Sequence, residues 1–197
     1  MFILGLTGGI ASGKSTVSNY LASKNIPIVD ADIGAREVVE VGTEGLQSIV
    51  THFGKEVLSE DGSLNRKKLG AIIFDNETKR ELLNQLLGTN IREWILTKVA
   101  DYRRQDIPLL VLDIPLLYEA SYQEVCDAVM VVYTPPEIQL ERLIKRNGLT
   151  TKEAQDRINS QLSIEKKKQL ADILIDNSNK IEDTYLQIDE WLDKMKF

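Results

Sequence analysis

Apolar residues in this chain gather in short continuous runs, separated by polar and turn-forming segments. Runs long enough to form a strand span residues 2–7, 26–29, 109–112 and 128–133, and a shorter run spans 173–175. Continuous apolarity, rather than alternation, is typical of parallel strands that are buried on both faces. Helical patterns lie between the runs, and strands that alternate with helices are joined by right-handed crossovers. The pattern therefore predicts an α/β fold with a doubly wound, parallel, five-stranded sheet.

Two segments interrupt the alternation of strands and helices. Residues 34–105 are too many for one crossover, and their apolar positions from Leu83 to Val99 recur at helical spacing, which predicts an inserted helical lobe. The second segment is polar, charged and helical in pattern, and we interpret it as a lid over residues 146–169. The remaining residues are expected to form the core of the protein, in three stretches: 1–33, 106–145 and 170–197.

Local patterns also predict where some helices begin and which faces meet solvent. In Thr134-Pro135-Pro136-Glu137 we expect Thr134 to cap a helix, with Glu137 completing a capping box. Thr150 and Glu153 have the spacing of a second capping box. The run Lys166-Lys167-Lys168 is interpreted as a solvated helix face.

Composition narrows the class of protein. The 197 residues are 43% apolar and 27% charged, with a net charge of −6, which is ordinary for a soluble globular protein. A negative net charge argues against general nucleic-acid binding, which needs a basic surface. Cys126, the single cysteine, is interpreted as a buried structural thiol. No stretch approaches the roughly 20 apolar residues of a membrane span, so we expect a cytoplasmic protein without a membrane partner.

Residues 8–15 carry the most specific chemical signal of the chain. They fit the phosphate-loop pattern G-x-x-x-x-G-K-[ST] between an expected strand and an expected helix. Glycines let successive backbone N–H groups turn toward one anion, and the helix N-terminus adds its dipole. A turn without a ligand is the weaker interpretation in this context. We expect ATP with Mg²⁺ to bind, with Lys14 at the outer phosphates and Ser15 on the metal.

Carboxylates follow two of the expected strands. The carboxyl ends of parallel strands face the crevice where α/β proteins bind ligands, and Asp32 there can orient an acceptor hydroxyl and receive its proton. Asp30 has two interpretations, a site residue or a helix cap. Asp113 is equally consistent with a carboxylate near Mg²⁺ and with the cap of a turn. Arg36 lies one helical turn after Asp32, where a surface ion pair is the plain alternative to a substrate contact.

Polar residues near the expected lid complete the candidates. Arg142, Arg146 and Arg157 can stabilise the charge of a transferring phosphoryl group if the lid closes, although a solvated face explains each of them alone. Asn177 follows the last expected strand and can contact a base or form a simple turn.

The order of these motifs closely resembles that of dephospho-coenzyme A kinases. The resemblance rests on Leu6–Thr16, Asp30-Ala31-Asp32 with Ala35-Arg36, Asp113–Glu119, Arg157-Ile158 with Gln161, and Ala171-Asp172 with Ile175-Asp176-Asn177. It runs almost from end to end. The phosphate loop is shared with other small-molecule kinases, whereas the Asp-Ala-Asp and Pro-Leu-Leu segments are not.

The resemblance implies transfer of the γ-phosphoryl group of ATP to the ribose 3′-hydroxyl of dephospho-coenzyme A, the last step of coenzyme A synthesis. It implies a catalytic Asp32 assisted by Lys14 and Arg142. It also implies nucleotide contacts from Arg146 and Asn177 and from a cradle formed by Gly9, Ala11, Ser12, Gly13, Lys14, Ser15 and Thr16. Substrate contacts fall on Thr7, Asp32, Arg36, Arg66 and Leu116. It also makes residues 34–105 the coenzyme-binding lobe. We expect a monomer or a weak homo-oligomer.

The chain departs from the family pattern in three places. Gly88-Thr89 stands where the family often has His-Pro, Asn179 where it often has Gly, and Asn147 where Asp is frequent. The alternatives are another nucleoside or small-metabolite kinase, a nucleotide switch, or a nucleotide-binding protein without turnover. A switch usually has D-x-x-G after a strand, and Asp113-Ile114-Pro115-Leu116 lacks that glycine.

Overall fold

The structure is a computed structural model that describes residues 1–74 and 76–197. The chain divides into two compact units. The sheet unit combines Met1–Val29 with Tyr102–Phe197, and the helical unit is Asp30–Asp101.

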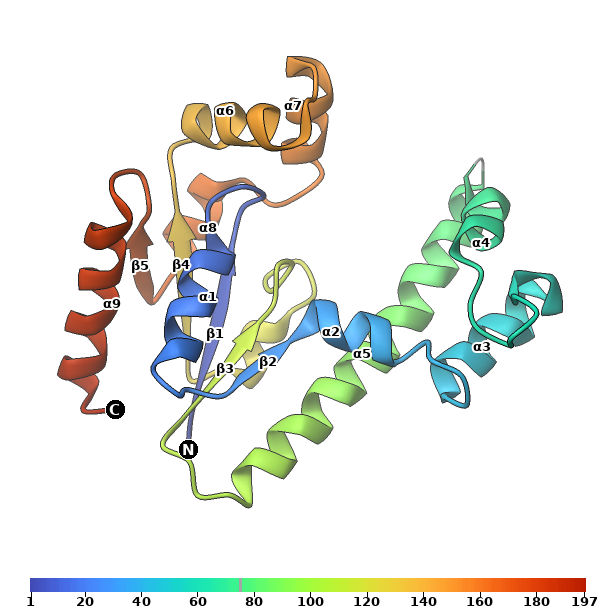
Figure 1. Cartoon of the computed structure of the whole chain (residues 1–197), viewed down its shortest axis with the longest axis horizontal. Coiled ribbons are helices and arrows are strands. Elements are labelled where there is room, and N and C mark those ends of the chain that lie inside the picture. The colour runs from blue at the N-terminus through green and yellow to red at the C-terminus, as the bar shows by residue number, and fades with distance from the viewer. Residues whose placement is uncertain (75) are drawn as a thin grey trace. The chain divides into compact units, whose positions relative to one another are not determined.

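A five-stranded sheet is the centre of the sheet unit, in the order β2-β3-β1-β4-β5 (Figure 1). The central strand pairs in parallel with β3 and β4, and β4 pairs in parallel with β5. Because β1 is covered on both faces, its residues are buried from Ile3 onward, which explains the continuous apolar run. The predicted α/β fold is confirmed, with strands β1 Phe2–Gly8, β2 Ile28–Asp30, β3 Leu109–Asp113, β4 Ala128–Tyr133 and β5 Ile173–Asp176.

Helices pack against this sheet around one apolar core. Leu4, Leu6 and Met130 from the strands meet Val17 and Ile188 from two helices that also contact each other, α1 and α9. The described helical elements of this unit are α1 Lys14–Ser23, η2 Tyr122–Val125, α6 Pro136–Asn147, α7 Thr151–Asn159, α8 Ile164–Leu170 and α9 Ile181–Met195.

The helical unit has a core of its own. Ile49, Phe53 and Leu69 are buried in it, together with Leu83 from the apolar stripe of the long helix α5. At Gly34 an added Cβ would lie 2.7 Å from the ring of Trp94, so only glycine allows α2 to approach α5 this closely. The described elements are α2 Ala31–Glu37, α3 Glu44–Phe53, η1 Lys55–Val57, α4 Arg66–Ile73 and α5 Glu77–Arg103, the last of which ends in the sheet unit.

The two expected capping boxes have different outcomes. The box of Thr150 and Glu153 forms, with each side chain accepting from the other residue's backbone N–H. The expected cap by Thr134 is wrong, because α6 begins one residue later than that cap requires. Pro135 occupies the N-cap position, and the Thr134 hydroxyl is buried without a hydrogen-bond partner among the described residues.

The lysine run is a second correction. Lys166 and Lys168 are exposed, but Lys167 between them is completely buried in the sheet unit, so the run is not a solvated face. The environment of Cys126 agrees with its interpretation as a structural thiol. Its thiol donates to the Tyr122 carbonyl, and burial raises its pKa to about 12, so it remains a protonated, weakly reactive group.

The sequence predicts that no segment of the chain crosses a membrane. Among residues 1–74 and 76–197, no helix combines the length and the apolarity that a bilayer span requires.

Candidate functional site

The phosphate loop connects the end of β1 to the start of α1. Two of its residues have left-handed backbone conformations, Ala11 with φ of 62° and Gly13 with φ of 95°. The Ser12 N–H donates to the Gly9 carbonyl at 3.0 Å and closes the first turn. Alternation of right- and left-handed residues turns backbone N–H groups toward one side, which creates a concave site for an anion.

The start of α1 favours the same kind of ligand. Gly13 is the N-cap residue, it provides no side-chain cap, and the first turn of the helix contains no acidic residue. The N–H groups at the start of a helix have no partner within the helix, and the dipole makes this end positive. A phosphate group satisfies both features, so the local sequence is suited to an anionic ligand.

Lys14 lies beside this helix start and forms an ion pair with Asp113 at the end of β3. The Lys14 side chain is 18% exposed and that of Asp113 is 4% exposed, so the lysine remains the accessible partner. Asp113 therefore contacts the phosphate-loop lysine in this structure, a partner that neither interpretation of the sequence included. The pair holds the Lys14 ammonium at the end of β3 in this structure.

Two glutamines hold the middle of the phosphate loop. The Ile10 N–H donates to Gln161 Oε1 at 2.9 Å, and Gln139 Nε2 donates to the Ile10 carbonyl at 2.7 Å. Both backbone groups of one residue are thus fixed by side chains from α6 and from the segment between α7 and α8. Sequence analysis missed Gln139, because no motif marks it, and quoted Gln161 only as part of a resemblance.

Asn177 binds the backbone of the phosphate loop through its side-chain amide. Its Nδ2 donates to the Ser12 carbonyl at 2.8 Å, and its Oδ1 accepts from the Thr184 hydroxyl at 2.9 Å. The residue is 7% exposed. Both ends of the amide are engaged within the protein, so the effect of Asn177 on a nucleotide is transmitted through the loop backbone.

Thr7 and Leu116 were expected at the substrate. Thr7 is completely buried, and its hydroxyl donates to the Pro115 carbonyl at 3.0 Å, so it supports the segment after β3 from inside. Leu116, the next residue after Pro115, is 44% exposed.

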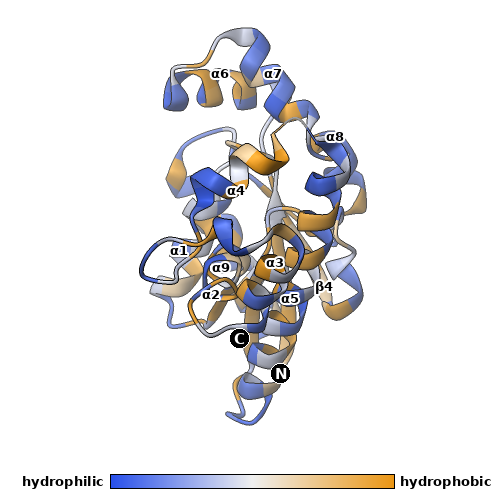
Figure 2. Ribbon diagram, turned by 90° about the vertical axis from the view of Figure 1, so that its right-hand side faces the viewer, coloured by the Kyte–Doolittle hydropathy of each residue, from blue (hydrophilic) through white to orange (hydrophobic). Residues whose placement is uncertain are grey.

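Arginines of the polar segment lie on two helices. Arg142 is half-buried and Arg146 is exposed one turn later on α6, where Arg146 Nε donates to Asn147 Oδ1 at 2.9 Å. Arg157 is exposed on α7, which packs against α6. Figure 2 shows mostly hydrophilic residues along α7.

In the helical unit, the Asp-Ala-Asp segment forms the start of α2. Asp30 is the N-cap, and its Oδ1 accepts from the Asp32 N–H at 2.7 Å, which agrees with the cap interpretation of Asp30. The Asp32 carboxylate is exposed in the first turn of the helix. Asp30 thus fixes the backbone of Asp32 and leaves its carboxylate available.

Arg36 and Arg66 come together in the helical unit. Both line an open pocket, although they belong to different helices, α2 and α4. The other lining residues are Val39, Glu40, Val41, Ser63 and Leu64. A pocket with two guanidinium groups and an apolar wall suits a ligand that combines phosphate with an apolar chain.

A parallel sheet, a phosphate loop between β1 and α1, and a lysine at the start of that helix define the chain as an α/β phosphate-loop protein. The chain belongs to the dephospho-CoA kinase family, whose model matches residues 2–183. A dephospho-CoA kinase of Oceanobacillus iheyensis is 50% identical over 192 residues, covering 98% of this chain and 96% of that protein. One of Enterococcus faecalis is 49% identical with the same coverage of both chains, 98% and 96%.

A solved structure supports the same assignment. The dephospho-CoA kinase from Campylobacter jejuni matches with a TM-score of 0.76 and 29% identity, over 98% of this chain and 96% of that one. The suspected resemblance and the predicted class of enzyme are therefore confirmed.

Proposed function

We propose that this protein transfers the γ-phosphoryl group of ATP to the ribose 3′-hydroxyl of dephospho-coenzyme A. The observation that carries the proposal is the family match over residues 2–183, which includes both the phosphate loop and the helical unit. Because the match covers almost the whole chain, it favours this acceptor over those of other phosphate-loop kinases.

The phosphate loop binds the nucleotide in this proposal. The loop residues Gly9 and 11–16 surround the phosphates, and Lys14 leaves Asp113 and pairs with the outer phosphates when ATP binds. Arg142 and Arg146 approach from α6 when the polar segment closes. Phosphoryl transfer has a loose transition state with its charge spread over the equatorial oxygens, so fixed positive groups stabilise it more than they stabilise bound ATP.

Mg²⁺ is the proposed metal, and the donor chemistry of the site fits it. Ser15 presents an exposed hydroxyl in the first turn of α1, and Mg²⁺ in kinases takes few protein ligands because phosphates and waters supply the rest. When bound, the ion neutralises charge on the phosphate oxygens.

The acceptor binds to the helical unit in this proposal. Arg36 and Arg66 pair with its diphosphate, and the apolar wall of their pocket contacts its uncharged chain. Asp32 orients the 3′-hydroxyl and accepts its proton as the new bond forms. The acceptor lobe then corresponds to residues 34–105, and residues 146–169 act as the lid. Thr7 contributes indirectly, because it is buried beneath Pro115.

A coupled assay of ADP release tests the proposal. The enzyme should turn over dephospho-coenzyme A and leave a panel of nucleosides and sugars almost unphosphorylated. Phosphorus NMR of the product should show a new monoester on the ribose 3′-oxygen. A product phosphorylated elsewhere, or turnover with another acceptor only, would contradict the assignment.

A further inference from the structure

Lys167 is a completely buried lysine that the phosphate-transfer chemistry described so far does not use. It lies in the middle of α8, at 0% exposure, while its neighbours Lys166 and Lys168 are exposed. Removal of an ammonium group from water costs several kcal/mol unless charge and hydrogen bonds compensate it. Helical propensity and solubility do not require a lysine at this buried position, so its partners are informative.

The Lys167 ammonium has a full set of acceptors. Its Nζ donates to the Gly8 carbonyl at 3.3 Å and to the Pro115 carbonyl at 3.0 Å, and it pairs with Glu119 Oε1 at 3.0 Å. A lysine has three N–H donors, so all of them are engaged. Burial lowers the pKa of Lys167, and the hydrogen bond and charge of Glu119 oppose that effect.

The two carbonyls belong to the strand ends that carry the candidate phosphate chemistry. Gly8 is the last residue of β1 and begins the phosphate loop, and Pro115 follows the end of β3 by two residues. These strands are neighbours, with Leu6 aligned opposite Asp113, the ion-pair partner of Lys14. One buried ammonium therefore joins the end of β1, where the phosphate loop begins, to the residues that follow β3.

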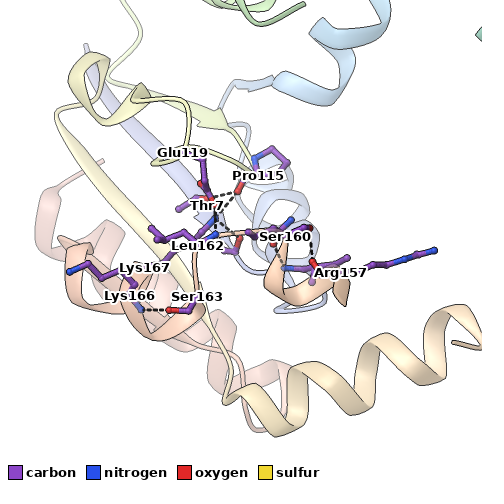
Figure 3. Close-up of polar contacts among 12 residues, drawn as sticks. Thr7, Pro115, Glu119, Arg157, Ser160, Leu162, Ser163, Lys166 and Lys167 are labelled. Carbon is purple, nitrogen blue, oxygen red and sulfur yellow. Dashed lines mark hydrogen bonds and ion pairs between the residues drawn. The ribbon is translucent and has the colours of Figure 1, made fainter. Parts of the chain in front are cut away.

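Glu119 extends the same cluster to the base of the polar segment. Its Oε1 also accepts from the Leu162 N–H at 2.9 Å. The residue before Leu162 is Gln161, which accepts from the Ile10 N–H of the phosphate loop. Figure 3 shows Lys167, Glu119, Thr7 and Pro115 side by side, with Leu162 next to them. The segment from Gln161 to Lys167 is thus bonded to both strand ends.

We infer that Lys167 is a positioning residue for phosphoryl transfer, which holds the Gly8 and Pro115 carbonyls in one fixed relation. The reaction named in this inference is that of the proposed function, whereas the contacts of Lys167 are observed in the structure. Lys167 does not touch the nucleotide, because it has no exposed surface. It acts through the loop: when the two strand ends are fixed, Lys14 and the loop N–H groups converge on one point. A displacement of about 1 Å in such an arrangement costs about 10²-fold in rate.

Lys167→Met tests this inference, because methionine keeps much of the volume but removes the charge and all three donors. Removal of one partner of a buried ion pair is destabilising, so we expect the variant to fold with a lower melting temperature, and kcat is measured per folded enzyme. We expect kcat to fall about 10- to 100-fold and ATP affinity, measured by calorimetry, to weaken. The KM for dephospho-coenzyme A should stay within about 2-fold, because that ligand binds to the helical unit.

Lys166→Met is the matched control. It removes the same charge from the same helix one residue earlier, at an exposed position, and should leave kcat, ATP affinity and the melting temperature unchanged. A purely structural role predicts a different result for Lys167→Met, namely a lower melting temperature with wild-type kcat for the folded fraction. That result, or equal losses in both variants, would overturn the inference.

Glu119→Gln keeps the inference testable if Lys167→Met does not fold. This variant retains Lys167 and the shape of its partner, but it removes the compensating charge. We expect the same loss of kcat with little change in the acceptor KM, and a wild-type kcat would count against the inference. If the unmodified enzyme does not turn over dephospho-coenzyme A, the proposed function fails, while the ATP affinities of the variants still decide the role of Lys167.

Discussion

Asp32 and Asp30 illustrate, at the scale of single residues, how two identical side chains take different roles. Asp30 accepts the N–H of Asp32 as a helix cap, whereas the Asp32 carboxylate is exposed. The sequence placed both after a strand, but it did not decide which one was the cap. That decision depends on where α2 begins, and helix ends are set by the hydrogen bonds of particular residues.

Asp32→Asn should lower kcat by about 10²- to 10⁴-fold, because the amide keeps the size of the side chain but cannot accept the acceptor's proton. ATP affinity should be almost unchanged. Asp30→Asn is the matched control, since asparagine caps helices as well as aspartate does, and it should retain near-wild-type kcat. We would measure turnover by coupled assay and ATP binding by calorimetry on the same folded samples. Together these measurements distinguish a loss of chemistry from a loss of ATP binding. Full activity in Asp32→Asn would remove this residue from the chemistry.

Gly13 is a position where the phosphate loop tolerates no side chain. Its φ is +95°, and an added Cβ would lie 1.9 Å from Asn177 Nδ2, which itself supports the loop. Gly13→Ala should therefore displace Asn177, lower the melting temperature and abolish detectable ATP binding. Gly148→Ala is the control, because Gly148 also has a positive φ, of +64°, but open space around it. It should cost only about 1 kcal/mol of stability and leave ATP affinity intact.

Lys167 marks the limit of sequence analysis at this scale. Three consecutive lysines on a helix have the same composition whether their middle member is buried or exposed. Only the partners decide, and Gly8 and Pro115 are 159 and 52 residues away in the sequence. The phosphate loop, by contrast, was predictable because its spacing reflects local backbone geometry.

At the scale of secondary-structure elements, the two expected capping boxes show which helix starts depend on local sequence and which depend on burial in the folded protein. Thr150 and Glu153 form their box at a helix start where both residues are exposed. Thr134 follows directly on the buried strand β4, and its side chain is fully buried. The N-cap of α6 is therefore Pro135 rather than Thr134, because burial at the end of the strand is an effect that a local pattern does not contain.

The polar segment of residues 146–169 is also less uniform than its composition indicates. Its second part is bonded to the phosphate loop and to Glu119 through Gln161 and Leu162. Its first part, α7, has only Ala154 buried and packs against α6. Since few buried contacts hold α7, we expect it to be the part of the proposed lid that moves.

Hydrogen exchange monitored by mass spectrometry tests this division. Exchange across residues 148–160 should be fast in the free enzyme and slow down when ATP and acceptor are both bound. Residues 161–170 should be protected already without ligand. Equal changes across both parts would show that the whole segment moves as one lid, and unchanged exchange in residues 148–160 would count against any lid.

At the scale of the whole molecule, the alternation of buried strands and helices was sufficient to predict the sheet. Strands that are buried on both faces have continuous apolar sequences. Four of the five observed strands start at the first residue of such a run. The exception is β2, which begins at Ile28 rather than at residue 26. The pocket between Arg36 and Arg66 was less predictable, because these residues lie on different helices and converge only in the folded unit.

Each unit has a separate apolar core and its own tryptophan, which makes their stabilities separately measurable. Trp191 packs against the core of the sheet unit, and Trp94 packs against that of the helical unit. The chain has two tryptophans, so Trp94→Phe and Trp191→Phe each leave one reporter. Trp94 also donates to Glu37 at 2.9 Å, so we expect Trp94→Phe to lower the stability of the helical unit slightly.

In urea titrations of these two variants, each ligand should stabilise mainly the unit that binds it. ATP at about 100 times its Kd adds about 2.7 kcal/mol to a folded state that binds it, which should raise the midpoint reported by Trp191 more than that reported by Trp94. Dephospho-coenzyme A should reverse the order, because Arg36 and Arg66 belong to the helical unit. Adenosine, which lacks phosphates, is the control for ATP and should move neither midpoint appreciably. If both tryptophans report one midpoint that either ligand shifts equally, the units unfold as a single cooperative structure, and their separate cores do not give them separate stabilities.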